Sequence, residues 1–359
     1  MGAVALRHML ERVLLVAVAA GLSVAWLLTY DASPSGEADF NVFYQAALHW
    51  REPYAPESTV GLPAWMQNGR SPFAYPPTFL LLALPFTLLP YFTAYVVWAV
   101  GSFALFVLAA SFLNLRAAWL LALSPFALLL AIGFGAPVTY QPLLYGLMTG
   151  QTAFWTGAGL IGAGLLLEKR PAWAGALLAI VACLKPTAAL VAPLILWGRW
   201  RGLTAAVLTG LGLVLASLAL GPHLWLEWIA AARAFKGGVL QLQPAAVFDH
   251  VLWQVALVAL GGWFAWRERN LAGLLVGGVL CAPYLMPYDL AALTALGVSR
   301  IGRQPQHWAL AAFGAALVVG LVGNAVSVLI GCVAVVLWFG LTELRRTGDG
   351  QGRAVGDRA

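Results

Sequence analysis

Charged side chains and cysteines are both scarce in this sequence, and each shortage narrows the class of protein. Charged residues make up 9% of the 359 positions, whereas hydrophobic residues make up 62%, and the mean hydropathy is +0.84. This composition excludes an ordinary soluble domain, in which about a quarter of the residues are charged, and it is typical of an integral membrane protein. The three cysteines each lie alone inside an apolar run, which excludes a disulfide framework and a cysteine-based metal site.

Acidic residues are fewer than basic ones, 14 against 20, so the formal net charge is +6. The basic residues cluster at the ends of apolar runs and do not form one continuous surface. The net positive charge therefore does not favour nucleic-acid binding. Short connectors rich in Arg and Lys stay on the cytoplasmic side of a membrane. They occur here at Arg7 and Arg12, Lys169-Arg170, Arg199 and Arg201, Arg267 and Arg269, Arg300 and Arg303, and Arg345-Arg346. This rule predicts that both termini are cytoplasmic and that segments 31–77, 222–249 and 287–289 lie on the outer face.

Long apolar runs fill most of the chain. A helix needs about 20 apolar residues to cross a bilayer, so these runs predict roughly 9 to 12 transmembrane or re-entrant helices. The expected fold is all-α and polytopic, with an outer loop that carries interfacial helices. We expect one membrane-embedded domain over 1–346, with 31–77 as its first outer loop, and a disordered cytoplasmic tail over 347–359. The number of full passes between 78 and 201 stays open at this point.

Two basic connectors, 169–170 and 199–201, conflict with a simple count of passes. Both are predicted to be cytoplasmic, yet one apolar run of spanning length lies between them. Leu184-Lys185-Pro186 interrupts this run, and proline breaks a helix because it lacks a backbone donor. A broken or re-entrant hairpin with Lys185 near its tip resolves the conflict. An ionisable residue inside an apolar run usually faces a cavity or a partner, which makes Lys185 a candidate for binding a phosphate.

The first outer loop is the main candidate for chemistry, because five acids and two arginines gather within 31–77. Asp39 precedes apolar residues with helical spacing, which predicts an interfacial helix that begins near this acid. Asp39 is therefore either the cap of that helix or a general base that accepts a proton from a hydroxyl group. Arg70 either holds a phosphate through its planar guanidinium or contacts anionic lipid headgroups.

Other polar residues are candidates for the same site, and each has a structural alternative. Gln151 either contributes to a polar cavity or makes an ordinary interhelical hydrogen bond. His250 is an acid–base candidate because histidine titrates near neutrality, or it is a solvated loop residue. Tyr288 and Asp289 lie near the outer boundary, where Asp289 either joins the site or caps the next helix. Nothing in the sequence resembles a glycine-rich phosphate loop or a metal cluster.

Six short motifs occur in a fixed order along the chain. They are Asp39-Phe40-x-x-Phe43-Tyr44-x-Ala46-Ala47, Pro53-Tyr54, Phe73-x-Tyr75-Pro76-Pro77, Gly150-Gln151, Leu184-Lys185-Pro186 and Pro287-Tyr288-Asp289. In this order the set resembles glycosyltransferase family 87, a family of GT-C-type membrane enzymes of which several bacterial members use polyprenyl-phosphate mannose. One departure is Gln241-Leu242-Gln243-Pro244, which lacks the Asn and Ser pattern associated with many relatives.

The resemblance implies a GT-C-like bundle in a bacterial plasma (inner) membrane, with an inverting hexosyltransferase site on the outer face. Asp39 would deprotonate an acceptor hydroxyl, while Arg70 and Lys185 would stabilise the departing lipid phosphate. The residues expected to line the substrates are Tyr44, Tyr75, Gln151, His250, Tyr288 and Asp289. The implied partners are a polyprenyl-phosphate-linked sugar, with mannose as the expected hexose, a glycolipid or glycan acceptor, and membrane lipids. No cofactor and no metal ion is implied.

Two other classes of function also fit the sequence. A transporter or flippase of a lipid-linked sugar would explain a polar cavity, Lys185 and broken helices, although no internal repeat is evident. A non-catalytic scaffold in envelope-polysaccharide assembly would need Asp39 only as a helix cap. Replacement of Asp39 by Asn separates the scaffold from the enzyme, because a cap tolerates Asn and a base does not.

Overall fold

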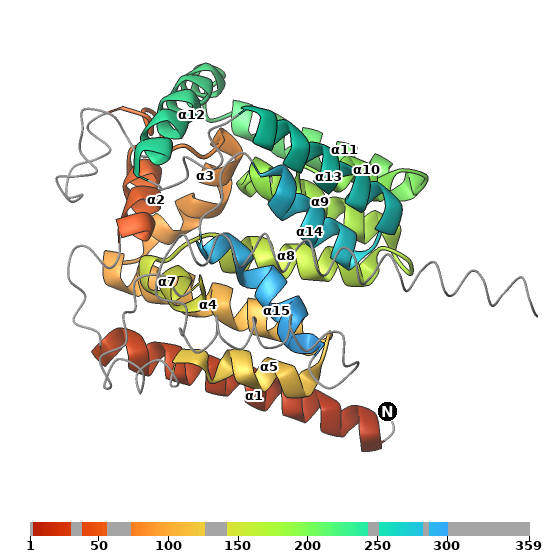
Figure 1. The fold of residues 1–359 in the computed structure, drawn as a ribbon. Coiled ribbons are helices and arrows are strands. Elements are labelled where there is room, and N and C mark those ends of the chain that lie inside the picture. Colours follow the sequence, from red (N-terminus) through yellow and green to blue (C-terminus); the bar gives the residue numbers. More distant parts are fainter. Residues whose placement is uncertain are drawn as a thin grey trace, which may run out of the picture.

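The computed structural model describes residues 3–29, 38–55, 73–125, 142–242, 251–282 and 287–300. These residues form helices and connectors, with no strand among them (Figure 1), which confirms the all-α expectation. The α-helices are α1 (Ala3–Thr29), α2 (Ala38–Leu48), α3 (Pro77–Ala83), α4 (Tyr91–Ser111), α5 (Leu115–Ala122), α7 (Pro142–Thr149), α8 (Ala153–Leu166), α9 (Pro171–Leu184), α10 (Ala192–Leu196), α11 (Trp200–Leu218), α12 (His223–Leu242), α13 (Val251–Glu268), α14 (Leu271–Cys281) and α15 (Ala291–Ser299). Short 3₁₀ helices are η3 (Leu84–Leu88), η4 (Pro186–Ala189) and η6 (Pro287–Leu290). The predicted tail 347–359 lies outside the described residues.

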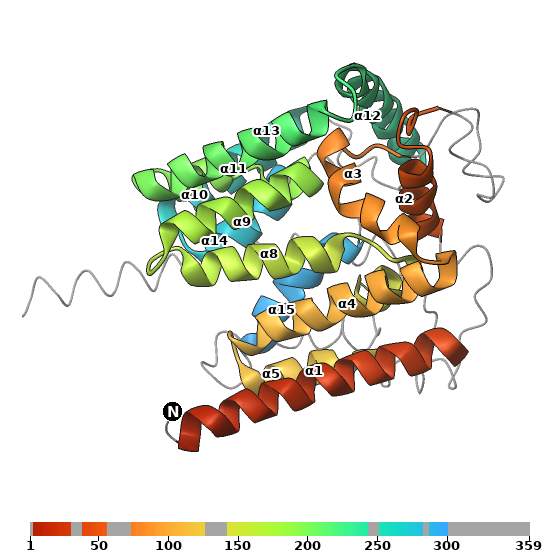
Figure 2. The same ribbon diagram turned by 180° about the vertical axis from the view of Figure 1, so that it is seen from behind.

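The helices form two packed layers. In the first layer α1, α4, α8, α9 and α11 lie side by side, each in contact with the next (Figures 1 and 2). In the second, α5, α15, α14 and α13 follow one another in the same way. Contacts of α8 with both α14 and α15 join the two layers. A continuous core of buried apolar side chains fills the space between them.

Among the residues that the structure describes, three helical segments are long and apolar enough to cross a membrane, Val4–Leu28, Tyr91–Ser111 and Trp200–Leu218. Several neighbours are apolar but shorter, among them α8 and α9 with 14 residues each and α14 with 11. A single helix of that length falls short of the bilayer core. The long apolar segments make this a helical membrane protein. The expected count of roughly 9 to 12 passes or half-passes is not confirmed.

Residues 171–199 form a broken hairpin, one of the two arrangements that the basic connectors predict. Helix α9 ends at Lys185, whose backbone is extended with φ −143° and ψ 91°, as expected for a residue that precedes proline. The chain then returns through η4 and α10 to the start of α9, where the guanidinium of Arg199 pairs with the carboxylate of Glu168. Lys185 lies at the tip of this hairpin. The two basic connectors therefore lie at the same end of the hairpin, as the sequence indicated.

Glycine residues allow α11 to pack tightly along the hairpin. A Cβ atom on Gly175 would lie 1.9 Å from the carbonyl oxygen of Gly202, and a Cβ atom on Gly202 would lie 2.9 Å from that of Pro171. Small residues allow this close approach of two helix backbones inside a membrane. The crossing of α9 and α11 therefore holds the base of the hairpin in place.

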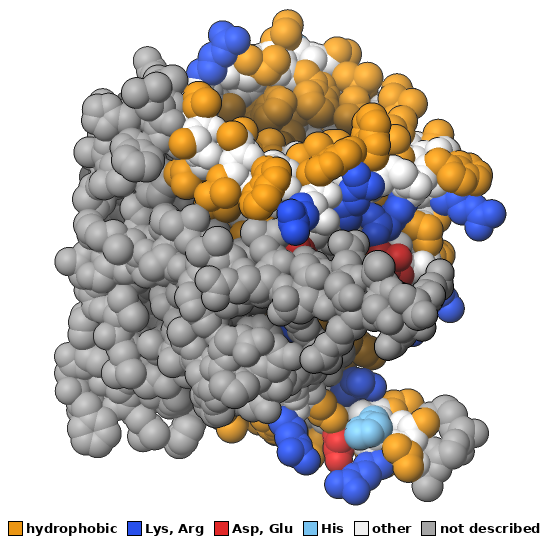
Figure 3. All heavy atoms as spheres, turned by 45° about the vertical axis from the view of Figure 1, so that its right-hand side comes forward, with side chains coloured by type: hydrophobic (Ala, Val, Ile, Leu, Met, Phe, Trp, Pro, Cys, Tyr) orange, Lys and Arg blue, Asp and Glu red, His pale blue; other side chains and the backbone are white. Residues whose placement is uncertain are grey.

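Basic connectors meet at the base of the hairpin. Besides its pair with Glu168, Arg199 donates a hydrogen bond of 3.1 Å to the carbonyl oxygen of Arg269. The Arg269 guanidinium lies 3.9 Å from the ring centroid of Trp266. Figure 3 turns this side of the molecule forward and shows Lys and Arg side chains beside exposed hydrophobic surface. Connectors that the sequence assigned to one side of the membrane are thus brought together.

Helices α2, α3 and α12 lie together at the other end of the bundle (Figure 1). The indole of Trp228 on α12 donates a hydrogen bond of 3.0 Å to the carbonyl oxygen of Ala74. Phe40 and Phe43 on α2 are 1% and 2% exposed and pack in the protein core. This differs from the expected interfacial helix, whose apolar stripe would face lipid. The stripe is covered by protein because α3, η3 and α7 pack against α2.

Gly175→Ala is expected to destabilise the protein by about 1–3 kcal/mol or more, because the new methyl group meets rigid backbone and forces α9 away from α11. Gly101→Ala on α4 is the matched control, since a Cβ atom there has nothing within 4 Å. Thermal unfolding of the detergent-solubilised proteins measures both effects. Equal stability of the two variants would show that the crossing of α9 and α11 is not tight.

Candidate active site

Asp39 lies in the first turn of α2 and is half-buried. Its carboxylate accepts hydrogen bonds from the side chains of Gln151 and Thr149, and the Lys185 ammonium acts on it electrostatically. Burial raises the pKa of Asp39, and these three partners lower it without cancelling that effect. Because α2 is not among the helices of membrane length, this carboxylate belongs to the end of the bundle and not to a spanning segment.

A tight turn at Gly150 holds the partners of Asp39. Gly150 has φ +66°, and a Cβ atom there would lie 2.7 Å from the Cβ of Phe40, so both the backbone angle and the space favour glycine. Two side chains of α4 bind the turn: the Trp98 indole donates a hydrogen bond of 2.8 Å to the Gly150 carbonyl, and the Tyr95 hydroxyl donates one of 2.5 Å to that of Met148. Thr149 and Gln151 are thereby held beside α2.

Lys185 at the tip of the hairpin forms an ion pair with Asp289 of η6. Their side chains are only 7% and 16% exposed. The Lys185 ammonium also lies 5.0 Å from the centroid of the Tyr288 ring, within reach of a cation–π interaction. Since the same ammonium acts on Asp39, one lysine faces two carboxylates that come from distant parts of the chain.

The two tyrosines of segment 31–77 that were expected to line the substrates differ in position. The Tyr75 hydroxyl lies 3.4 Å from the Oγ1 of Thr152, directly beside the Gly150 turn. Tyr44 instead donates a hydrogen bond of 2.9 Å to the carbonyl of Leu89 and packs its ring 5.2 Å from that of Tyr91. Tyr75 therefore borders the site, whereas Tyr44 supports the segment between η3 and α4.

Most of the predicted site residues that the structure describes come together. The cluster consists of Asp39, Gln151, Lys185, Tyr288 and Asp289, and we call it the Asp39–Lys185 cluster. Thr149 is a partner that sequence reasoning missed, although its place two residues before Gln151 was a usable signal. Arg70 and His250 lie outside the described residues.

The chemistry of the cluster is that of proton transfer next to a cation. A half-buried carboxylate with a raised pKa is suited to accept a proton, and a nearby ammonium is suited to stabilise an anion. Within the described ranges, no group of three or more His, Cys, Asp and Glu side chains is placed to hold a metal ion.

The fold and the cluster together define a membrane protein with a polar site at one end of a helical bundle. The chain belongs to glycosyltransferase family 87, whose family model matches residues 73–327, so it is a membrane glycosyltransferase. No significant match was found among curated proteins or among solved structures. The matched range includes Gln151, Lys185 and Asp289 but begins after α2 and Asp39.

Asp289→Asn is expected to destabilise the protein by about 3 kcal/mol, because it removes one of the carboxylates that face the buried Lys185. The double variant Lys185→Met/Asp289→Leu should recover part of this loss, since it removes the unbalanced lysine charge, while Asp39 keeps its hydrogen bonds from Gln151 and Thr149 but loses its cation. Denaturant unfolding in detergent measures both. Glu168→Gln is the matched control: it breaks an ion pair whose carboxylate is 77% exposed, so the cost should stay below about 1 kcal/mol. An Asp289→Asn loss no larger than this control would contradict the role of the pair.

Proposed function

We propose that this glycosyltransferase moves a hexose, with mannose as the first candidate, from a polyprenyl-phosphate donor to a glycolipid or glycan acceptor. The transfer inverts the anomeric carbon and takes place on the outer face of a bacterial plasma (inner) membrane, with both chain termini on the cytoplasmic side. Membership of the family supports the transfer of a sugar. The observation that carries the mechanism is the set of contacts around Asp39.

In this mechanism Asp39 acts as the general base. Its carboxylate takes the proton of the acceptor hydroxyl while the hydroxyl oxygen forms a bond to the anomeric carbon from the face opposite the phosphate. The bond between that carbon and the phosphate oxygen breaks, and the phosphate leaves with the electron pair. The raised pKa of Asp39 favours this role, because a carboxylate that binds a proton more tightly is a stronger base.

Lys185 stabilises the departing phosphate. Its ammonium already acts on Asp39, so the cation and the base are near enough to serve one substrate. A cation held in a water-poor site stabilises developing negative charge more strongly than it would in water. The anionic phosphate competes with Asp289 for Lys185, and Arg70 of the first outer loop is proposed as a second phosphate ligand. The departing lipid phosphate carries up to about two negative charges, which the cations of Lys185 and Arg70 together would balance.

The remaining residues position the substrates. Gln151 holds the Asp39 carboxylate, and Tyr288 packs on Lys185. Tyr75, beside Thr152, is proposed to line the path of the sugar. Tyr44 and His250 complete the proposed lining. The contribution of Tyr44 is indirect, because its hydroxyl supports the segment between η3 and α4.

Asp39→Asn is expected to lower the rate of sugar transfer by about 10²–10⁴-fold, the usual contribution of a general base. The assay offers synthetic polyprenyl-phosphate mannose and a panel of glycolipid and glycan acceptors to membranes that contain the protein. Glu52→Gln is the control, because it removes an exposed carboxylate from the same loop. Equal transfer by wild type and Asp39→Asn would remove Asp39 from catalysis. No transfer by either protein would contradict the proposed reaction, and a flipping assay would then test transport as the function.

The pH dependence of transfer tests the same carboxylate. Only ionised Asp39 accepts a proton, so kcat/KM should fall on the acid side around a pKa above the ordinary range of an aspartate. Gln151→Ala removes a hydrogen bond that lowers this pKa, and the acid limb should therefore move to higher pH. Gln45→Ala is the control, because that side chain bonds to Asn41 on the same helix. An acid limb that stays in place in Gln151→Ala would exclude Asp39 as the titrating base.

A further inference from the structure

The connectors at the base of the hairpin carry an excess of positive charge. Together with the adjoining helix ends they contain two acids, Glu168 and Glu268, and six basic residues, which are Lys169, Arg170, Arg199, Arg201, Arg267 and Arg269. Arg199 ties the connectors together through its ion pair with Glu168 and its hydrogen bond to the carbonyl oxygen of Arg269. Among the residues that the structure describes, Arg199 is the only one of the six that forms an ion pair with a carboxylate. Positive charge at this end of the bundle is therefore not balanced by the protein.

Exposed tryptophan rings accompany the arginines at this end. Three guanidinium groups each lie near the centroid of an indole ring, in the pairs Arg201–Trp200 at 5.4 Å, Arg267–Trp263 at 5.8 Å and Arg269–Trp266 at 3.9 Å. The ring of Trp197 lies 5.7 Å from that of Trp266. These four tryptophans are between 41% and 69% exposed. We call the three arginines and four tryptophans the Arg–Trp surface.

The Arg–Trp surface lies at one end of a helix of membrane length. Trp200 and Arg201 are the first two residues of α11, which is long and apolar enough to cross a membrane. Further along this helix Leu203, Val207 and Leu211 are exposed, and Figure 3 shows Lys and Arg side chains beside hydrophobic surface on this side of the molecule. Tryptophan is enriched where a membrane meets water. The cations are therefore placed at the level of lipid head groups, with an apolar helix face next to them.

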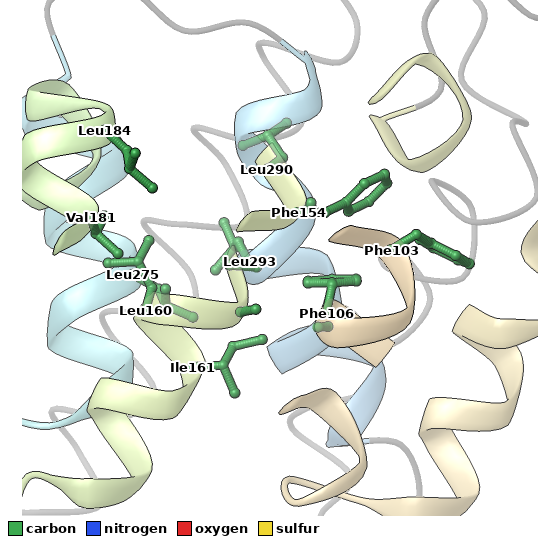
Figure 4. Close-up of a cluster of buried hydrophobic side chains, with 14 of the residues drawn as sticks. Phe103, Phe106, Phe154, Leu160, Ile161, Val181, Leu184, Leu275, Leu290 and Leu293 are labelled. Carbon is green, nitrogen blue, oxygen red and sulfur yellow. The ribbon is translucent and has the colours of Figure 1, made fainter. Parts of the chain in front are cut away.

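This surface is separate from the Asp39–Lys185 cluster. Helix α9 runs from the basic connectors to Lys185, and its 14 residues span about 21 Å at a rise of about 1.5 Å per residue. Apolar side chains of α8, α9 and α14 meet beside this helix, among them Leu160, Val181 and Leu275 (Figure 4). The proposed transfer reaction therefore leaves the Arg–Trp surface unassigned.

We propose that the Arg–Trp surface binds the head group of an anionic phospholipid, whose acyl chains lie along the exposed face of α11. A guanidinium group suits a lipid phosphate, because its parallel N–H donors match two phosphate oxygens. The excess of positive charge disfavours a zwitterionic head group, whose amine it repels. The apolar face of α11 favours a lipid over free phosphate, which would gain nothing from that face. This site does not depend on the proposed sugar transfer.

The test measures the binding of phosphatidylglycerol and phosphatidylcholine to the purified full-length protein by native mass spectrometry. Wild type should prefer phosphatidylglycerol. The variant Arg201→Gln/Arg267→Gln should bind phosphatidylglycerol about 10–25-fold more weakly, since each basic residue near a membrane surface contributes about fivefold. Its affinity for phosphatidylcholine should stay the same. Both arginines are exposed, so thermal unfolding without added lipid should not change.

Two further variants separate a built site from a general attraction between charges. Arg7→Gln/Arg116→Gln is the matched control, because it removes the same charge from exposed positions on α1 and α5, across the bundle from α11 and α13 (Figures 1 and 2). This control should keep the affinity of wild type. Arg201→Lys/Arg267→Lys keeps the charge and loses the planar fork, so it should show a smaller loss. It replaces the glutamine variant if that one fails to fold.

Three outcomes would overturn the proposal. Equal affinity of wild type for the two lipids would remove the selection by charge. An equal loss in the control variant would show that diffuse charge, and not the Arg–Trp surface, attracts the lipid. Displacement of phosphatidylglycerol by inorganic phosphate at the same concentration would show that the acyl chains contribute nothing. The assay contains no sugar donor, so its result is independent of whether the protein performs the proposed reaction.

Discussion

The need to balance one buried lysine charge organises the centre of this molecule. A charged side chain inside a membrane protein is costly unless a partner neutralises it. Lys185 meets this need through Asp289, which is 104 positions away in the chain, and through its electrostatic interaction with Asp39. Three segments, the hairpin tip, η6 and α2, therefore converge on a single ammonium group. The same group that holds them together is the one proposed to stabilise the departing phosphate.

Aromatic packing fixes the geometry around that charge. Phe40 of α2 lies with its Cβ against the Gly150 turn, and Trp98 and Tyr95 of α4 bind the carbonyls of that turn. The Trp98 ring also lies 5.9 Å from those of Phe40 and Phe43. Asp39 and Gln151 are thus placed by the same rigid cluster. The proposed base and its hydrogen-bond partner are therefore held in place by one set of aromatic contacts.

The family match and the site overlap without coinciding. Residues 73–327 carry the match, and they contain the hairpin, the Gly150 turn and η6. Helix α2 precedes this range, yet the side chains of Thr149 and Gln151 bind its first-turn carboxylate. Tertiary contact therefore links Asp39 to the part of the chain that matches the family. The proposed base and the proposed phosphate ligand come from different parts of the chain.

The sequence by itself determined the membrane class, the all-α fold and the broken hairpin with Lys185 at its tip. These features follow from composition, from the length of the apolar runs and from the position of Lys185-Pro186 between two basic connectors. All three can be found in the sequence alone, so no tertiary information was needed. Only the tertiary structure decided that Lys185 pairs with Asp289, that Thr149 joins Gln151 on Asp39, and that the apolar stripe of α2 is covered by protein. Periodicity shows that a face is apolar but not whether lipid or another helix covers it, because the partner is chosen by packing between segments distant in the chain.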